Sequence, residues 1–183
     1  MAGPEHRLTC ANLRKGRGLW PRGRLTTLTG QGTTLEDMER TGRYYWIASV
    51  ADAFRTAQTM GGRVHLFPFS MEGLLAIDLA ARHPLIATLT LLDTPHKFRK
   101  PSLCAGTLTK HVQQFHYWEY DGRGLPHGME QYAVGYKGFP VNTMWKLVAV
   151  RKQATKRASD VKAPAVVIQS EADENVDPIN SDN

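Results

Sequence analysis

Cysteine is scarce in this chain. Two of its 183 residues are cysteines, Cys10 and Cys104, and neither lies in a C-x-x-C motif. Isolated cysteines argue against a disulfide scaffold and favour a reducing compartment, so we expect a cytoplasmic protein. No apolar run approaches the roughly 18 residues that a membrane-spanning helix needs. The N-terminal residues lack the apolar segment of a secretory leader, so we expect no such signal.

Clustered metal ligands are also lacking. No group of His, Cys and acidic residues has the spacing of a metal site, so we predict neither a metal nor another cofactor. The charge is positive, with 23 Lys and Arg residues against 17 Asp and Glu residues and a net charge of +6. This excess is large in residues 1–24, where the acidic residue is Glu5. A basic arm can bind nucleic acid, but this one has a single aromatic residue, Trp20, and no nucleic-acid fold signature follows it. We therefore expect an irregular, solvated arm and no nucleic-acid partner.

Residues 25–183 show the pattern of one α/β domain. The whole chain is 42% hydrophobic and 22% charged, which is an ordinary globular composition. Helical periodicity alternates with short apolar runs, as in a parallel sheet with crossover helices. The strands around residues 64–69, 86–92 and 165–169 should therefore be adjacent and parallel. The expected helices are 44–60, 71–82 and 143–158, and the expected strands are 25–28, 64–69, 86–92 and 165–169.

An insertion over residues 95–142 interrupts this alternation. It is rich in Gly and Pro and carries a dense set of aromatic side chains, among them Phe115, Tyr117 and Trp118. Two interpretations stay open. The insertion forms a cap that binds an apolar acyl group, or its aromatic residues cover one face of the sheet.

A serine between a strand and a helix is the most informative local feature. Ser70 follows the apolar run Val64–Phe69 and precedes the apolar helical segment from Leu74. This arrangement is typical of the nucleophile elbow, in which the N–H of the next residue, here Met71, helps to bind an oxyanion. The elbow pattern is G-x-S-x-G, whereas this chain has Pro68 and Glu72 at the glycine positions and Gly73 one place further on. We expect crowding at positions 68 and 72. The alternative is an ordinary helix-capping serine.

Several segments together resemble the α/β-hydrolase superfamily, in its carboxylesterase and monoacylglycerol-lipase branch. Residues 29–38, TGQGTTLEDM, are similar to the family sequence LPGHGTTPEDM. Four further segments follow in the family's order: the helix around residues 46–50, the elbow at 69–76, the helix end LAARHP at 79–84 and the segment 161–173. The resemblance spans residues 25–182 and implies an α/β fold with a mainly parallel sheet.

The resemblance also implies roles for individual residues. Ser70 matches the nucleophile, Met71 the oxyanion donor, and Asp173 the acid that orients a catalytic histidine. Asp93 and Asp177 are the alternatives for this acid. The implied reaction is hydrolysis of a carboxylic ester with an apolar acyl chain through a Ser70 acyl-enzyme. The expected partner is therefore a small ester or lipid substrate. The sequence does not indicate which oligomeric state the protein has.

The chain departs from the family pattern in its histidines. The family order is Ser, acid, His, but no histidine follows Asp173, and Gln31 replaces the histidine of the G-H-G turn. The first strands of the fold and its final strand and helix have no counterpart here. We interpret six of the seven histidines as polar surface residues, not as the catalytic base: His65, His83, His96, His111, His116 and His127. Two further hypotheses stay open: a catalytically impaired α/β-hydrolase-like binding protein or fragment, and a basic nucleic-acid-associated protein.

Overall fold

The computed structural model describes residues 25–97, 115–117, 138–171 and 176. Some of the predicted features lie outside these ranges, and what was predicted for them stays a prediction. They are the arm over residues 1–24, most of the insertion, Asp173, Asp177, His111 and His127. The elements are α1 (Leu35–Arg40), α2 (Arg43–Thr59), β1 (Val64–Leu66), α3 (Met71–Arg82), β2 (Ile86–Leu92), β3 (Phe115–Tyr117), β4 (Gly138–Pro140), α5 (Val141–Arg157), the 3₁₀ turn η4 (Ala158–Asp160) and β5 (Ala165–Ile168).

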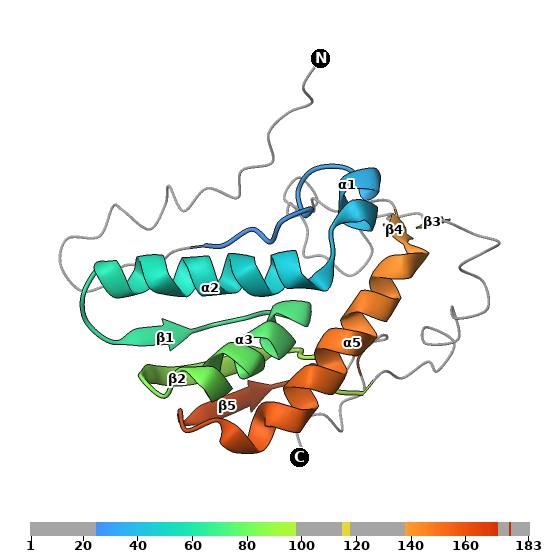
Figure 1. The fold of residues 1–183 in the computed structure, drawn as a ribbon. Coiled ribbons are helices and arrows are strands. Elements are labelled where there is room, and N and C mark those ends of the chain that lie inside the picture. The colour runs from blue at the N-terminus through green and yellow to red at the C-terminus, as the bar shows by residue number, and fades with distance from the viewer. Residues whose placement is uncertain (1–24, 98–114, 118–137, 172–175, 177–183) are drawn as a thin grey trace, which may run out of the picture.

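A parallel three-stranded sheet with the order β1-β2-β5 forms the centre of the described fold. β1 pairs with β2, and β2 pairs with β5 in a register that sets Leu89 opposite Ala165 and Leu92 opposite Ile168. The predicted α/β class and the parallel pairing of these strands are confirmed. In Figure 1, α3 passes in front of β2 and α2 runs above β1, and both α2 and α5 pack against α3.

Helix α3 lies at the middle of the hydrophobic core. All eight residues of its segment 73–80 are buried, because neighbours surround the helix: α2 and α5 pack beside it and β2 lies beneath it. The side of β2 that faces the helices contributes Leu89 and Leu91, which are buried. From α2 come Trp46, which is fully buried, and Phe54, at 3% exposed. The apolar runs that predicted these elements therefore supply the core.

Several predicted boundaries differ from the structure. Residues 25–28 form no strand, although the Leu28 side chain is buried. The strand predicted over residues 64–69 is shorter, because β1 ends at Leu66 and pairing resumes only as a bridge between Phe69 and Leu92. Pro68 lies in this gap and has no N–H to donate to a strand ladder. α1 was not predicted, and two described pieces of the insertion form the antiparallel pair β3–β4.

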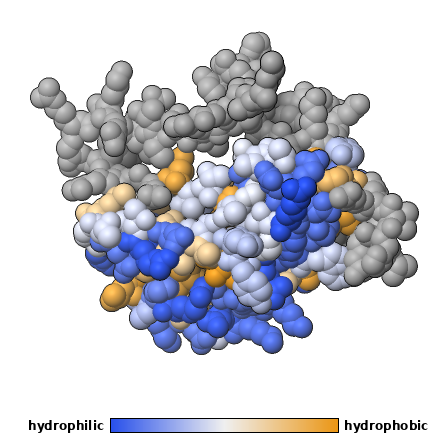
Figure 2. Space-filling model, turned by 45° about the horizontal axis from the view of Figure 1, so that its top comes forward, coloured by the Kyte–Doolittle hydropathy of each residue, from blue (hydrophilic) through white to orange (hydrophobic). Residues whose placement is uncertain are grey.

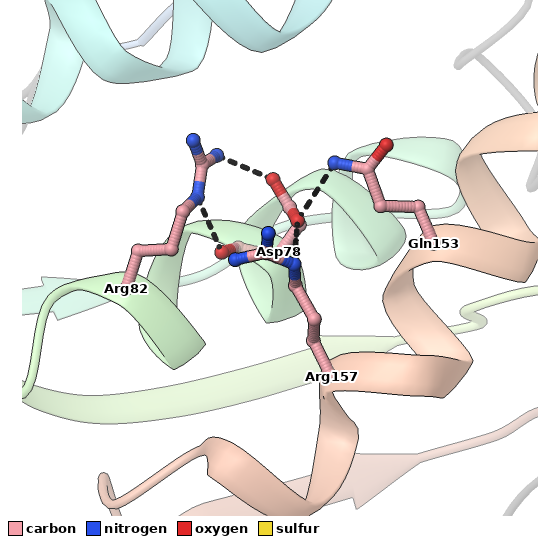
Figure 3. A network of polar contacts seen from close by, with 4 residues as sticks. All are labelled: Asp78, Arg82, Gln153 and Arg157. Carbon is pink, nitrogen blue, oxygen red and sulfur yellow. Dashed lines mark hydrogen bonds and ion pairs between the residues drawn. The ribbon is translucent and has the colours of Figure 1, made fainter.

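A buried ionic network joins α3 to α5 (Figure 3). Asp78 on α3 has a side chain that is only 2% exposed, and it pairs with Arg82 one turn later. From α5, Gln153 Nε2 donates to Asp78 Oδ1 at 2.9 Å, and Arg157 Nε lies 3.4 Å from the same oxygen. A buried carboxylate needs such partners because its desolvation is costly. The network therefore fixes where α5 lies against α3.

Removing both cations of this network should destabilise the fold. For Arg82→Met combined with Arg157→Met, we expect the free energy of unfolding to fall by about 3 kcal/mol, since a buried carboxylate loses its counter-charges. Urea denaturation measures this loss. The matched control is Arg55→Met, because Arg55 pairs with Asp52 through side chains that are 74% and 63% exposed. Its effect should stay within about 0.5 kcal/mol. Equal losses in the two variants would contradict a structural role for the network.

The side of the sheet that faces away from the helices is exposed at β5. Val166 and Ile168 are 58% and 52% exposed, and their register places them beside Thr90 and Leu92 of β2. His65 of β1 lies on the same side, where its Nδ1 contacts Thr88 Oγ1 at 2.8 Å. In the view of Figure 2, by contrast, hydrophilic residues predominate on the coloured surface. Parallel strands are usually covered on both faces, so this apolar exposure is unusual.

This exposed apolar face should bind a hydrophobic dye. We expect fluorescence of 1-anilinonaphthalene-8-sulfonate with the wild type, and a decrease of about twofold with Val166→Thr combined with Ile168→Thr, which removes two apolar groups from the patch. Thr90→Val, on the same side of the sheet, should raise the signal. If none of these variants differs from the wild type in dye binding, the face is not accessible in solution.

Candidate functional site

The backbone at Ser70 has an unusual conformation. Ser70 has φ 54° and ψ −124°, and it directly precedes α3. A positive φ is uncommon for a residue other than glycine and costs on the order of 1–3 kcal/mol, so the surrounding structure must hold it. Two hydrogen bonds to β2 do so: Ser70 N donates to Leu92 O at 2.8 Å, and Leu92 N donates to Pro68 O at 3.1 Å. The turn is therefore fixed at the carboxyl end of the strand region, as the sequence predicts.

The Ser70 side chain does not cap the helix. At the start of α1, Thr34 has extended backbone angles, and its side chain accepts a hydrogen bond from Asp37 N at 3.1 Å. Ser70 makes no such side-chain bond to α3. The chain thus contains an ordinary capping residue for comparison, and Ser70 differs from it in both backbone angles and hydrogen bonding. The capping interpretation of Ser70 is therefore wrong.

Met71 is the first residue of α3. The N–H groups of the next two residues are engaged, since Glu72 N donates to Phe69 O at 3.1 Å and Gly73 N donates to Ser70 O at 3.0 Å. The N–H of Met71 has no acceptor within the helix, because the first N–H groups of a helix never do. It adjoins Ser70 and lies at the positive end of the helix dipole. This is the geometry that an oxyanion donor needs.

The close backbone approach at this turn is made by Gly73. A Cβ on Gly73 would lie 1.9 Å from Thr94 Oγ1, 2.7 Å from its Cγ2 and 2.8 Å from its Cβ. Thr94 follows β2 and is 1% exposed, so it has little room to move. The sequence predicts crowding at positions 68 and 72, but the tight contact lies at 73, where glycine is present. Position 72 instead has room for the glutamate side chain.

Glu72 lies in the first turn of α3 and is half-buried. Burial raises the pKa of its carboxyl group above the ordinary value of a glutamate. Gln31 and Glu72 are two positions at which the chain departs from the family pattern.

Comparison with known proteins bears on the fold of the chain. No family model matches the chain. A thermostable monoacylglycerol lipase from Bacillus sp. (strain H-257) is 27% identical over 158 residues, which cover 86% of this chain and 62% of the lipase. A solved structure from work on the metagenome-derived lipolytic enzymes LipS and LipT matches with a TM-score of 0.73 and 24% identity over 84% of this chain and 62% of that chain.

The monoacylglycerol lipase of Paleococcus ferrophilus matches with a TM-score of 0.57 and 15% identity, over 78% of this chain and 59% of that chain. The chain has part of an α/β-hydrolase fold. It spans about three fifths of the length of these relatives. The predicted resemblance to lipases and esterases of this superfamily is thus confirmed.

Asp93 has a structural role in this hydrolase fold. It follows β2 with φ 44°, and its Oδ1 accepts hydrogen bonds from Ser170 N at 2.7 Å and Gln169 Nε2 at 3.0 Å. These bonds tie the end of β2 to the segment that leaves β5. The segment after β5 therefore starts at the sheet edge where Ser70 lies. Asp173 lies two residues beyond Glu171, the last residue described in this segment, and its role stays a prediction.

Four histidines lie within the described residues, and their positions relative to Ser70 differ. His83 ends α3, about 18 Å from its start at a rise of 1.5 Å per residue, and its ring packs 4.8 Å from that of Phe54. His65 lies on the exposed face of β1, and His116 lies in β3 with its ring 5.7 Å from that of Phe139. His96 follows the carboxyl end of β2, at the Ser70 edge of the sheet.

The environment of His96 favours the neutral form of its imidazole. Its pKa is lowered, first by burial and then by the positive charge of Arg151. Arg151 Nη1 also donates to the backbone oxygen of His96 at 3.1 Å. A neutral imidazole is the form that accepts a proton, so the lowered pKa is compatible with base chemistry.

Neither a metal site nor a membrane-spanning helix is found in the described part of the chain. No group of three His, Cys, Asp or Glu side chains able to hold a metal ion is found within residues 25–97, 115–117, 138–171 and 176. None of the helices formed by these residues is both long enough and apolar enough to cross a bilayer.

Substitution of Gly73 should disrupt the elbow. We expect Gly73→Ala to lower the free energy of unfolding by about 1–3 kcal/mol, because the new methyl group overlaps Thr94. Thr94→Ala removes two of the three crowding atoms, and its own cost should be small because Thr94 Oγ1 is buried without a hydrogen-bond partner. The double variant should therefore regain part of the loss in thermal denaturation. Additive losses would show that the two residues do not meet.

Proposed function

We propose that this chain carries the nucleophile of a carboxylic ester hydrolase, with Ser70 forming an acyl-enzyme. The observation that carries the proposal is the conformation of Ser70: a positive φ, no capping bond, and a backbone tied to Leu92. A structure that needed only a helix cap would not hold serine in this strained geometry. Strain of this kind is concentrated at functional sites.

The proposed reaction has two stages. In the first, Ser70 Oγ attacks the ester carbonyl carbon while a base takes the hydroxyl proton, and the proton then passes to the leaving alcohol. In the second, water attacks the acyl-enzyme and releases the acid. The N–H of Met71 would donate to the oxyanion in both stages. One such donor contributes about 10²- to 10³-fold to kcat in serine hydrolases.

The acid and the base are proposed separately. We propose Asp173 as the acid that orients the imidazole of a histidine. Among the described histidines, His96 is the candidate for the base, because it follows β2 at the Ser70 edge of the sheet and its lowered pKa favours the neutral, proton-accepting form. His111 and His127, outside the described residues, are the other candidates. If none of these histidines reaches Ser70, turnover should be weak, since only the oxyanion donor and substrate binding would then contribute to catalysis.

The proposed substrate is an ester with an apolar acyl chain. Two large apolar residues just before the nucleophile, Phe67 and Phe69, have side chains that are 70% and 60% exposed. An exposed apolar surface beside a nucleophile favours apolar ligands. The lipolytic activity of the relatives is consistent with this class of substrate.

A p-nitrophenyl ester assay tests the proposal. Wild type with p-nitrophenyl butyrate should release a burst of about one nitrophenolate per chain and then turn over more slowly, because acylation and deacylation are separate steps. Ser70→Ala should abolish the burst. Ser159→Ala is the matched control, because Ser159 is exposed on η4, and it should leave the burst unchanged.

The same assay distinguishes the remaining hypotheses. His96→Gln should slow the burst about 100-fold or more if His96 is the base. If neither wild type nor Ser70→Ala releases nitrophenolate above the blank without protein, the esterase proposal is contradicted and a binding protein or fragment is favoured. If both release it equally above that blank, another group reacts and the role of Ser70 is contradicted.

A further inference from the structure

The strand β5 is an edge of the described sheet and is uncovered on both of its faces. In the order β1-β2-β5, no described strand lies beyond β5, which forms the lower rim of the sheet in Figure 1. Val167, on the side that faces the helices, is 38% exposed, whereas its register partner Leu91 on β2 is buried. Val166 and Ile168, on the other side, are more than half exposed. Parallel strands are usually covered on both faces, so this edge is unusual.

The hydrogen bonds between β2 and the β5 segment show which backbone groups of β5 point outward. Leu89 N donates to Pro164 O at 3.0 Å, and Asp93 N donates to Ile168 O at 2.9 Å. The backbone groups of even-numbered residues therefore point toward β2. Because successive residues of a strand direct their backbone groups to opposite sides, the N–H and C=O of Val167 point away from β2. An edge with outward N–H and C=O groups is a template for a further strand.

The segment around β5 lacks the features that usually protect an edge strand. Residues 163–170 carry no charged side chain, and charges on an edge normally oppose pairing with another chain. Pro164 removes no donor from this edge, because its backbone groups face β2. The other described edge differs: β1 has three residues, its register is irregular between Val64 and His65, and Pro68 follows it. β5 is therefore the described edge that is better suited to pair with a further strand.

Opposite charges lie at the two ends of the β5 edge. Lys162 precedes the strand and Glu171 follows it, and both side chains are exposed. If two copies of this edge paired in parallel, like charges would meet at both ends. In an antiparallel pair, each lysine instead comes near the glutamate of the other copy. Two-fold symmetry, the commonest symmetry of homodimers, also requires the antiparallel arrangement. The edge is therefore complementary to itself.

We propose that β5 is the interface of a homodimer, in which it pairs antiparallel with β5 of a second copy of this chain. Residues directly opposite each other in such a pair must both point their backbone groups at the partner or both point them away. Val167 points outward, so it can lie on the two-fold axis opposite its own copy. Ala165 then lies opposite Gln169, and the two sheets join into one.

The side chains favour this register over the neighbouring one. With Val167 on the axis, Val166 of each copy lies opposite Ile168 of the other. Cross-strand pairs of β-branched side chains stabilise a sheet, and these two side chains are more than half exposed in the single chain. A register centred on Val166 would instead set Ile168 opposite Pro164. The exposed apolar groups of β5 thus become cross-strand neighbours only in the first register.

Val167→Lys tests the interface, because it sets two like charges against each other on the axis. In sedimentation velocity of the full chain from about 1 to 100 µM, the wild type should shift from monomer to dimer as its concentration rises. We expect Val167→Lys to raise the dissociation constant about 10-fold or more. The matched control is Gln58→Lys, which adds the same charge at an exposed position of α2 and should leave the dissociation constant unchanged.

A mixture of two variants separates repulsion at the axis from a failure to fold. Val167→Lys and Val167→Glu should each be mainly monomeric alone. An equimolar mixture should form the dimer, because opposite charges then meet on the axis. Thermal denaturation of each variant checks folding independently of association.

Disulfide cross-linking tests the register. In a background with Cys10→Ser and Cys104→Ser, Val167→Cys should give a covalent dimer under mild oxidation, since the two Cα atoms would lie about 5.5 Å apart. Val166→Cys is the matched control. Its own copy lies two residues away in this register, so its cross-linking should be several-fold slower.

The outcomes decide the proposal without reference to Ser70, so it stands or falls separately from the proposed function. Loss of the dimer in Val167→Lys and its return in the mixture would support the β5 interface. A wild type that stays monomeric at about 100 µM would overturn it. A dimer that Val167→Lys leaves intact would also overturn it, because the copies would then meet at another surface. Equally fast cross-linking of Val166→Cys and Val167→Cys would contradict the antiparallel register.

Discussion

The turn at Ser70 is the constraint on which the described structure depends. It joins β1 to α3 and is held to β2 by the bond from Ser70 N to Leu92 O. The contact of Gly73 with Thr94 brings the start of α3 against the segment that follows β2. These two contacts set the position of α3, and α2 and α5 pack against that helix. The same turn leaves the Met71 N–H without an intrahelical acceptor. Packing and proposed chemistry thus share one backbone feature.

The elements with strong local patterns could be predicted from sequence. β2 matches its prediction over residues 86–92, and α3 matches over residues 71–82, because apolar content and periodicity fix them locally. β1 ends earlier than expected, since Pro68 interrupts its ladder, and residues 25–28 stay irregular although Leu28 is buried. Tertiary contacts are harder to predict. No pattern in the sequence shows that a Cβ is excluded at position 73 and accepted at 72.

The candidate site was likewise predictable only in part. Ser70 and Met71 lie where the strand-to-helix pattern and the family resemblance place them, because both depend on residues close in the sequence. The close approach of Gly73 to Thr94 joins residues that are separated in the sequence, so only the fold brings it to view. Asp93 was an alternative for the catalytic acid, and its Oδ1 accepts hydrogen bonds from Ser170 N and Gln169 Nε2, which the sequence did not predict. Asp173 lies outside the described residues and stays a prediction.

The central claim is that Ser70 becomes acylated, and localising the acyl group tests it most directly. Wild type would be mixed with p-nitrophenyl butyrate, quenched in acid within seconds, digested and analysed by tandem mass spectrometry. The account predicts one butyryl group, on Ser70 itself, and its absence from Ser70→Ala. An acyl group found instead on a lysine or on another serine, with Ser70 unmodified, would contradict it.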